Sequence, residues 1–265
     1  MNKKIIFFDI DGTLYAKELG GVSPRVKAAI KKVKSKGHLC FIASGRPYGY
    51  IAENIRALDF DGYVLANGAN IKYNHDDLKS RFLNPQDVKE LIEALKSKNI
   101  EYVLQTSTYC YMPKENDCLL NFYSQCNIDF KNFCHEYDED EVIQRVVKLE
   151  VWVKDQVELD YAIAHYQKFN YELHPDNHSM EVYSQKVSKA TGILDVLELF
   201  HIDIENSYCF GDGPNDVEMF ETVAHPIAMG NAIDIIKEKA EDVCLGVLED
   251  GVAYKLEELF DLEIK

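Results

Sequence analysis

The sequence of 265 residues predicts an α/β protein in which a smaller α+β domain is inserted into a Rossmann-like, doubly wound parallel sheet. Two observations support this prediction. At both ends of the chain, short apolar segments alternate with amphipathic helical segments, which is typical of parallel strands joined by crossover helices. Between residues 83 and 184, the strand-like segments look antiparallel. We therefore expect a core domain over 1–82 and 185–265, and an inserted α+β domain over 83–184.

The first predicted strand covers Ile5–Phe8, an uninterrupted apolar segment that suits a strand buried on both faces. Asp9 and Asp11 follow it, and side chains two residues apart on an extended backbone point the same way. Gly12 ends the strand, so both carboxylates should lie at the carboxyl edge of the sheet, where open α/β sheets bind ligands. Two like charges this close raise each other's pKa unless a cation lies between them. The pair predicts either a bound divalent metal or one carboxyl kept protonated, and a solvated Asp-Gly turn is the alternative.

The following segments extend this sheet. After a loop over 15–22, Ser23 is a natural N-cap and Pro24 suits the first position of a helix. The second strand ends in Ser44-Gly45-Arg46, where a hydroxyl and a free backbone amide can hold a phosphate, although this motif by itself favours an ordinary strand-to-helix turn. The predicted elements are a helix from 24 to about 36 and strands over 39–43 and 62–66, the last closed by Asn67-Gly68-Ala69-Asn70.

The predicted insertion begins with a helix at Asn84-Pro85. Its segment 146–154 alternates apolar residues with Lys148, Glu150 and Trp152, so one face of that strand should be buried and the other polar. The polar face is either exposed to solvent or closes over an active site. The expected helices cover 85–98, 115–125 and 156–169, and the expected strands cover 101–105, 109–112, 146–154, 171–174 and 180–183.

The parallel pattern resumes after Lys189, with a helix over 190–200 and a strand over 207–210. That strand ends in a turn whose three oxygen-bearing side chains suit a hard cation. Alone, the turn could be an ordinary surface feature, but it is expected on the same sheet edge as the first acidic pair. The turn reads Gly211-Asp212-Gly213-Pro214-Asn215-Asp216, and it is followed by a short strand to 228, a helix over 233–240 and a strand near 243.

Composition limits the classes of partner. The formal charge of −16 disfavours nucleic acid and anionic membrane surfaces. No apolar segment approaches the roughly 20 residues of a membrane span, and the start of the sequence leads into a core strand rather than a signal peptide. The seven cysteines, an odd number, favour reduced thiols in the cytoplasm. An anionic substrate would need a metal and local Lys or Arg residues to reverse the field.

Four motifs, in this order and spacing, resemble those of the haloacid dehalogenase-like (HAD-like) phosphohydrolases. They are Asp9-Ile10-Asp11-Gly12-Thr13-Leu14, Ser44-Gly45-Arg46, Lys189 and Gly211-Asp212-x-x-Asn215-Asp216. Three further features resemble the Cof-type branch with its type IIB cap: Ala228-Met229-Gly230-Asn231-Ala232, Glu249-Asp250-Gly251-Val252 and the insertion after Asn67-Gly68-Ala69. The resemblance covers the whole chain.

The resemblance implies a role for each motif residue. Asp9 would be the nucleophile that forms an aspartyl-phosphate, and Asp11 would be the general acid and base. Mg²⁺ would be held by Asp9, by the main-chain carbonyl of Asp11 and by Asp212, with Asp216 close by. The groups expected to bind the transferring phosphoryl are Ile10, Ser44, Gly45, Lys189 and Asn215. Arg46 would either reach the phosphate or hold the loop.

The implied function is a cytoplasmic, Mg²⁺-dependent phosphatase of a small phosphorylated metabolite, either a sugar phosphate or a phosphorylated cofactor. A phosphomutase of the same fold and a non-catalytic binding protein are the alternatives. In the insertion, five side chains on two strands would form a polar and aromatic surface that selects the leaving group. These candidates for specificity are Lys148, Glu150, Trp152, Glu181 and Tyr183, and a solvent face without a role is the competing interpretation.

Overall fold

A computed structural model describes residues 3–125, 128, 130–174 and 176–263. The chain divides into two compact units. The first, here called the core unit, contains residues 1–45, 53–78 and 188–265, and the second, the inserted unit, contains residues 46–52 and 79–187. The sequence analysis expected 46–52, 79–82 and 185–187 in the core domain, whereas the structure groups these short segments with the insertion. Each unit is described by itself below.

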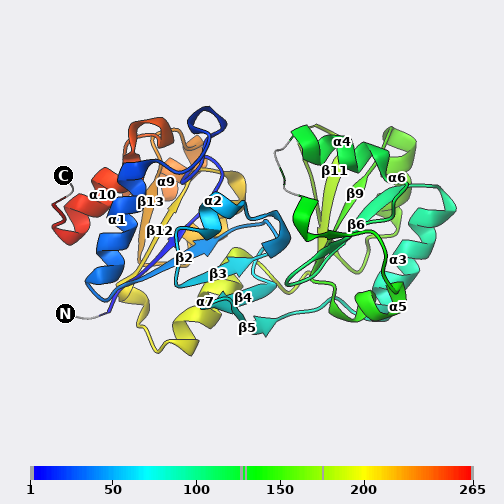
Figure 1. Ribbon diagram of the computed structural model, residues 1–265, viewed down its shortest axis with the longest axis horizontal. Helices are drawn as coiled ribbons and strands as arrows, with labels where there is room; N and C mark the ends of the chain where they lie inside the picture. The colour runs from blue at the N-terminus through cyan, green and yellow to red at the C-terminus, as the bar shows by residue number, and fades with distance from the viewer. Residues whose placement is uncertain (1–2, 126–127, 129, 175, 264–265) are drawn as a thin grey trace. The chain divides into compact units, whose positions relative to one another are not determined.

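The core unit is built on one eight-stranded sheet with β1 near its middle (Figure 1). The strand order is β14-β13-β12-β1-β2-β3-β4-β5, and the pairings from β14 through β3 are parallel. The strands cover β1 Ile5–Phe8, β2 Leu39–Ala43, β3 Gly62–Leu65, β4 Asn70–Tyr73, β5 Asp76–Ser80, β12 Ser207–Gly211, β13 His225–Ala228 and β14 Asp242–Val243. The predicted doubly wound α/β sheet is thus confirmed.

Local sequence signals set the helices of the core unit. Ser23 caps α1 by accepting a hydrogen bond from the Val26 amide at 3.2 Å, and Pro24 occupies the first helical position, as predicted. The apolar face of α1 is buried, and α1 packs against α10. The helix α7 packs against β3 and β4. The helices are α1 Pro24–Ser35, α2 Glu53–Arg56, α7 Lys189–Leu199, α8 Val217–Phe220, α9 Asp234–Lys239 and α10 Gly251–Phe260.

The hairpin formed by β4 and β5 is the main feature of this sheet that the sequence analysis did not predict. β4 pairs antiparallel with β3, so the sheet is mixed at this edge. Asn74 and His75, between β4 and β5, both have positive φ values of 48° and 73°. Left-handed backbone at both turn residues is the geometry of a tight hairpin, and Asn is one of the few residues that adopts it readily. The signal was therefore present at Asn74, but it lacked the Gly that normally marks such a turn.

The inserted unit has a six-stranded sheet of order β10-β11-β9-β6-β7-β8. Its pairings are antiparallel except for the short parallel pair β7 and β8. The strands cover β6 Glu101–Gln105, β7 Cys110–Tyr111, β8 Phe133–Cys134, β9 Lys148–Trp152, β10 Asn170–Leu173 and β11 Ser179–Tyr183, and the helices cover α3 Pro85–Ser97, α4 Asp117–Gln125, α5 Glu139–Val142 and α6 Gln156–Ala164. The expected α+β character is confirmed, while β8 and α5 were not predicted.

Two hydrophobic clusters stabilise the inserted unit. The larger contains Leu149 and Val151 of β9 together with the apolar faces of α3 and α6. The smaller contains Val103 of β6, Tyr123 of α4 and Tyr50 of the segment 46–52, with Trp152 packed at its margin. The first cluster confirms the predicted apolar face of β9. The second cluster shows that residues of the inserted unit itself cover part of the opposite, polar face of β9.

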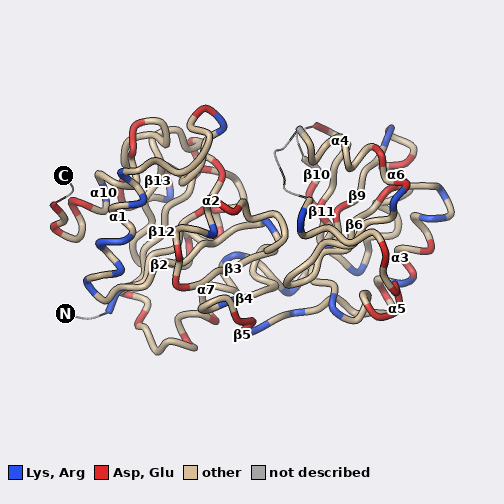
Figure 2. Tube along the Cα trace, in the orientation of Figure 1, with Lys and Arg blue, Asp and Glu red and all other residues tan. Residues whose placement is uncertain are grey.

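Among the described residues, no helix is long and apolar enough to cross a membrane. The six cysteines that the structure describes are free thiols, and Cys126 lies outside the described residues. Asp and Glu positions are distributed over both units (Figure 2), in line with the charge of −16. A site for an anion therefore has to create its own local positive field.

Candidate active site

The acidic motif lies at the carboxyl end of the central strand. β1 pairs with β12 on one side and with β2 on the other, and the Asp9 amide continues the ladder by donating to the Phe210 carbonyl at 3.0 Å. Asp9 is buried, with 5% of its surface exposed, whereas Asp11 is exposed. The two carboxylates thus differ in their exposure to solvent.

A second set of carboxylates comes from the loop after the neighbouring strand β12. Asp216 folds this loop on itself, because its Oδ2 accepts hydrogen bonds from the amides of Asp212 at 3.0 Å and Gly213 at 3.1 Å. Gly211 has to lack a side chain here, since a Cβ would lie 2.6 Å from Asp216 Oδ2. The loop therefore brings Asp216 to the carboxyl edge beside Asp9, as the sequence analysis expected.

Lys189 joins the two acidic segments. Its Nζ lies 2.6 Å from Asp9 Oδ1 and 2.6 Å from Asp216 Oδ1, and all three side chains are buried. Ser188 fixes the start of α7 through a reciprocal capping box with Thr191. Gly68 allows the turn after β3 to approach this helix start, because a Cβ there would lie 2.0 Å from the Ser188 carbonyl oxygen. The sequence analysis grouped Lys189 with the acidic motifs only through the resemblance, and the structure now provides the contact.

The pKa shifts follow from burial and from this pairing. Burial raises the pKa of Asp9 well above its usual value, although Lys189 opposes the shift. Burial also raises the pKa of Asp212 to about 6, although the hydrogen bond from Thr13 acts to lower this pKa. Burial disfavours the charged form of Lys189, but the carboxylates of Asp216 and Asp9 outweigh it and raise the pKa of the ammonium. When ionised, Asp9, Asp212 and Asp216 carry three negative charges against the one positive charge of Lys189. The cluster therefore favours a further cation.

The donor set fits a hard divalent cation. Asp9, Asp212 and Asp216 each offer a carboxylate oxygen, and these oxygens lie within 4.8 Å of one another. Thr13 Oγ1 donates to Asp212 Oδ1 at 2.9 Å, which orients that carboxylate. An all-oxygen set of carboxylates is the kind that Mg²⁺ prefers. The Asp11 carboxylate lies outside this group, and the sequence analysis had likewise given only the main-chain carbonyl of Asp11 to the metal.

Ser44, Gly45 and Asn215, three of the expected phosphate-binding residues, follow strands β2 and β12 of the core unit. Ser44 follows β2, is buried, and its amide donates to the Val64 carbonyl at 2.9 Å. An ideal Cβ on Gly45 would lie 2.8 Å from Asn67 Oδ1 and 3.8 Å from Asn215 Nδ2. The structure therefore brings Gly45 and Asn215 together, although they are far apart in the sequence. Asn67 was not assigned a role from the sequence. It has a left-handed φ of 53° in the turn after β3, a conformation that Asn adopts more readily than most residues.

Two of the candidates for specificity in the inserted unit lie in its interior. Lys148 and Glu150 are buried, with 0% and 3% of their surfaces exposed. Lys148 pairs with Glu181 across the β9–β11 ladder, and His174 Nε2 lies 3.6 Å from the same carboxylate. Although burial opposes ionisation, Lys148 and His174 lower the pKa of Glu181 to about 2. Alternation along a strand does not reveal what covers its polar face, so this burial could not be read from the sequence.

The remaining candidates also make contacts within the inserted unit. Trp152 stacks on His178, with ring centroids 5.2 Å apart. Tyr183 is half-buried and lies opposite Lys148 in the sheet. Arg46 donates to the Tyr50 carbonyl at 3.2 Å, which supports the interpretation that it holds its own loop. Their role in selecting a substrate stays a prediction.

Glu150 is the acceptor for three buried donors: Tyr50 Oη at 3.1 Å, Tyr123 Oη at 2.7 Å and Gln105 Nε2 at 3.3 Å. We expect Glu150→Ala to destabilise the inserted unit by about 3 kcal/mol, because each buried donor left without a partner costs roughly 1–3 kcal/mol. Glu150→Gln, which keeps one acceptor oxygen, should lose less. Urea unfolding would measure both, with the exposed Glu172→Ala as the control. Equal stability of Glu150→Ala and the control would contradict the prediction.

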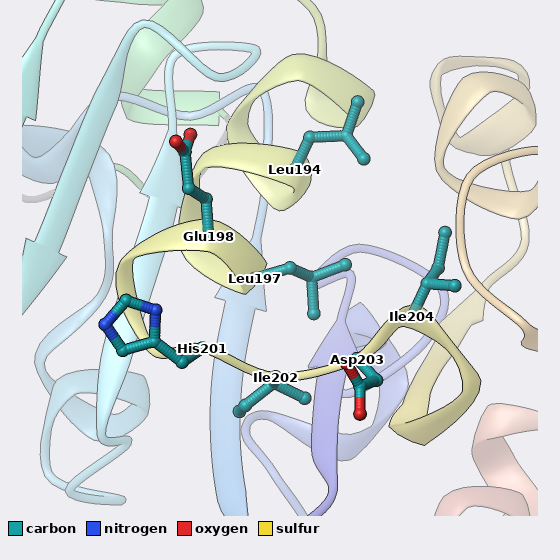
Figure 3. Close-up of a pocket in the computed structure, with 7 residues that line it drawn as sticks. All are labelled: Leu194, Leu197, Glu198, His201, Ile202, Asp203 and Ile204. Carbon is teal, nitrogen blue, oxygen red and sulfur yellow. The ribbon is translucent and has the colours of Figure 1, made fainter.

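One hollow of the core unit lies away from the acidic group. It has a volume of about 440 Å³, and it is formed at the C-terminal end of α7 (Figure 3), whereas Lys189 begins that helix. An eleven-residue helix is roughly 16 Å long, so the two sites are separate. The lining residues are Leu194, Leu197, Glu198, His201, Ile202, Asp203 and Ile204. None of the predicted site residues is among them, and we do not assign the hollow to the active site.

The fold and the site together define the class of protein: an α/β enzyme with an inserted α+β unit, whose polar groups meet at the carboxyl edge of a parallel sheet. The chain belongs to the haloacid dehalogenase-like hydrolase family, whose model matches residues 6–256. It is a phosphatase of that family, which confirms the expectation drawn from the four motifs.

Two relatives from Bacillus subtilis (strain 168) align along nearly the whole chain. YkrA, which is named as a phosphatase by proposal, is 29% identical to this chain over 264 residues. The alignment covers 98% of each chain. YwtE, a 5-amino-6-(5-phospho-D-ribitylamino)uracil phosphatase, is 28% identical over 282 residues, which cover 97% of this chain and 98% of YwtE. A solved sugar phosphatase of HAD subclass IIB shares the fold, with 24% identity, a TM-score of 0.80, and coverage of 98% of this chain and 100% of that one.

Proposed function

We propose that the protein hydrolyses the phosphate monoester of a small metabolite, either a sugar phosphate or a phosphorylated cofactor or cofactor precursor. The observation that supports the proposal is the buried Asp9–Lys189–Asp216 group at the end of β1, because a carboxylate that can attack phosphorus lies there beside an ammonium that can stabilise the charge of a phosphoryl group. The ribitylaminouracil phosphate named for YwtE supports the second class of substrate. The cytoplasmic location expected from the sequence stays a prediction.

Asp9 is proposed as the nucleophile. One carboxylate oxygen of Asp9 attacks phosphorus, the ester bond breaks, and the leaving oxygen takes a proton from the Asp11 carboxyl. Water then attacks the phosphorus of the aspartyl-phosphate, gives a proton to Asp11, and phosphate leaves. Lys189 contacts Asp9 directly, so its ammonium is placed to stabilise negative charge on the transferring phosphoryl oxygens. Ser44, the Gly45 amide and Asn215 are proposed to bind the other oxygens.

Mg²⁺ is proposed to be held by Asp9, Asp212 and the main-chain carbonyl of Asp11, with Asp216 beside them. When bound, the ion supplies charge neutralisation for the carboxylates and for the phosphoryl oxygens. The electrostatics of the chain support this proposal, because burial raises the pKa of both Asp9 and Asp212 and a cation would favour their ionised forms.

The test of the proposed function is a panel of phosphorylated metabolites assayed for phosphate release with Mg²⁺. It should include hexose and pentose phosphates, phosphorylated vitamins and 5-amino-6-(5-phospho-D-ribitylamino)uracil. We expect one class to give a kcat/KM well above that of a generic aryl phosphate. Phosphoryl transfer from Asp9 to a sugar, with no release of phosphate, would instead indicate the phosphomutase alternative.

Proton competition should make Mg²⁺ binding depend on pH. Burial raises the pKa of Asp212 to about 6, so protons compete with a cation for this carboxylate at mildly acidic pH. We expect the Mg²⁺ affinity to fall as the pH is lowered from 7.5 to 5, since a protonated carboxyl is a poor ligand. Calorimetric titration of Mg²⁺ at several pH values measures this, and an affinity independent of pH over this range would refute it.

Asp11 is expected to act on protons rather than on the metal. Asp11→Asn keeps the main-chain carbonyl and removes the proton carrier, so turnover should fall by about 1,000-fold while Mg²⁺ affinity changes little. Activity and Mg²⁺ titrations of the same preparation test this. A parallel loss of metal binding and activity would show that the Asp11 carboxylate itself is a ligand.

A further inference from the structure

Asn231 lies in a loop that the proposed mechanism does not use. The loop follows β13 and precedes α9, and Asn231 itself is exposed to solvent. The sequence analysis noted the residue only as part of a segment that resembles the Cof-type branch, and gave it no role. Its side chain nevertheless makes contacts with three other loops at the carboxyl edge of the core sheet.

Both the nitrogen and the oxygen of the Asn231 side-chain amide have polar partners. Nδ2 donates to the Gly12 carbonyl at 2.9 Å and lies 3.5 Å from Asp212 Oδ2, while Oδ1 accepts from the Val247 amide at 2.8 Å. The partners themselves fix which end is nitrogen, because two of them are acceptors and the third is a donor. The amide therefore connects the loops that follow β1, β12 and β14.

The backbone around Asn231 is also tightly held. The Ile233 amide donates to the Asp212 carbonyl at 3.1 Å. A Cβ on Gly230 would lie 2.8 Å from the Gly246 nitrogen, so the two loops are in close contact. On the other side, a Cβ on Gly12 would lie 2.1 Å from Asp212 Oδ2. The Asp212 carboxylate is thus enclosed by Gly12, by Thr13 on its Oδ1 and by Asn231 on its Oδ2.

We propose that Asn231 is a positioning residue for the divalent metal site, which holds the Asp212 carboxylate against the loop of Asp11 and Gly12. The inference rests on the proposed function, since it assumes that Asp212 is a metal ligand. A fixed carboxylate loses less conformational entropy on binding a cation than a mobile one. Residues that orient a ligand in this way typically contribute a factor of about 10–100 in metal affinity.

The test is calorimetric titration of Mg²⁺ into the full-length protein without substrate. We expect Asn231→Ala to raise the Mg²⁺ dissociation constant by about 10–100-fold. Because Asn231 is exposed, water can satisfy the groups it leaves, so the thermal midpoint should stay close to that of the wild type. In activity assays, saturating Mg²⁺ should restore most of kcat, since the residue is not expected to contact the phosphoryl group.

Asn206→Ala is the matched control, because Asn206 immediately precedes β12, at the opposite end of the strand from Asp212. Its Mg²⁺ affinity should equal that of the wild type. If Asn231→Ala does not fold, Asn231→Ser, whose hydroxyl is too short to span the three loops, should show the same weakened binding. Wild-type affinity in a folded Asn231 variant would overturn the inference and leave the proposed function intact. Failure of the wild type to bind Mg²⁺ would overturn the metal assignment itself.

Discussion

Replacing Asp9 by Asn is expected to reduce kcat for phosphate release by about 10⁴-fold or more. The substitution keeps the shape of the side chain but removes the attacking carboxylate and one proposed metal ligand. It also replaces a charged partner of Lys189 with a neutral one, while Asp216 remains at 2.6 Å to hold the ammonium. The fold should therefore survive, so the loss of activity reports on chemistry rather than on stability.

Steady-state kinetics with the best ester and with a generic aryl phosphate measure this effect. The control is Asp203→Asn, the same substitution at an exposed residue that precedes the short 3-10 helix before β12. Phosphate release should be unchanged in the control. Near wild-type turnover by Asp9→Asn would end the covalent mechanism, whichever metabolite proves to be the substrate.

Replacing Lys189 by Met is expected to affect both stability and activity. Met has a similar length but no charge, so Asp9 and Asp216 would be left as neighbouring buried carboxylates without their cation. Breaking a buried ion pair by removing one partner costs about 3–5 kcal/mol. Loss of the ammonium that faces the phosphoryl group should also lower kcat by at least 100-fold. Chemical unfolding at pH 7 and kinetics of the folded fraction measure the two effects.

The stability loss in Lys189→Met should depend on pH with a defined sign. The folded-state pKa of Asp9 is already raised by burial, and removing Lys189 removes the effect that opposed this shift. A carboxyl whose pKa is higher in the folded state binds its proton more tightly there. Its contribution to stability is therefore present below the unfolded pKa and is lost as the pH rises through the folded pKa. Lys189→Met should be closest to the wild type near pH 4 and furthest from it at neutral pH.

The exposed Lys186→Met provides the control, because it removes one positive charge without breaking a buried pair. It should unfold as the wild type does at every pH. A Lys189→Met protein that is as stable as this control at pH 7 would show that the two carboxylates share a proton or find another cation.

The positions of Asp9 and Asp212 were predictable from the sequence. Each follows a short, mostly apolar strand, and a glycine ends the extended segment shortly afterwards, at Gly12 and Gly213. The carboxyl ends of parallel strands necessarily meet at one edge of the sheet. The helix α1 was predictable for the same local reasons, since Ser23 and Pro24 mark its start and the spacing of its apolar residues defines its buried face. These features depend on neighbours in the chain and so are visible in the sequence.

The contacts of Lys189 and Asn231 could not be derived in this way. Lys189 is 180 residues from Asp9, and Asn231 is 219 residues from Gly12. A lysine at a helix start or an asparagine in a loop has no local feature that shows its partner. Only the parallel pairing of β1 with β12, and the approach of α7 to the turn at Gly68, bring these groups together.

The sequence by itself determined the α/β class, the family and the acidic edge, because strand and helix periodicity and the residues at strand ends are local properties of the chain. The tertiary structure alone decided which face of β9 is covered and where residues 46–52 belong. Alternation predicted a polar face at Lys148 and Glu150, but Tyr50 and Tyr123 bury Glu150 and satisfy it with hydrogen bonds. Whether a strand face is buried depends on the segments that pack against it. Those segments are distant in the sequence, so the local pattern of the strand does not identify them.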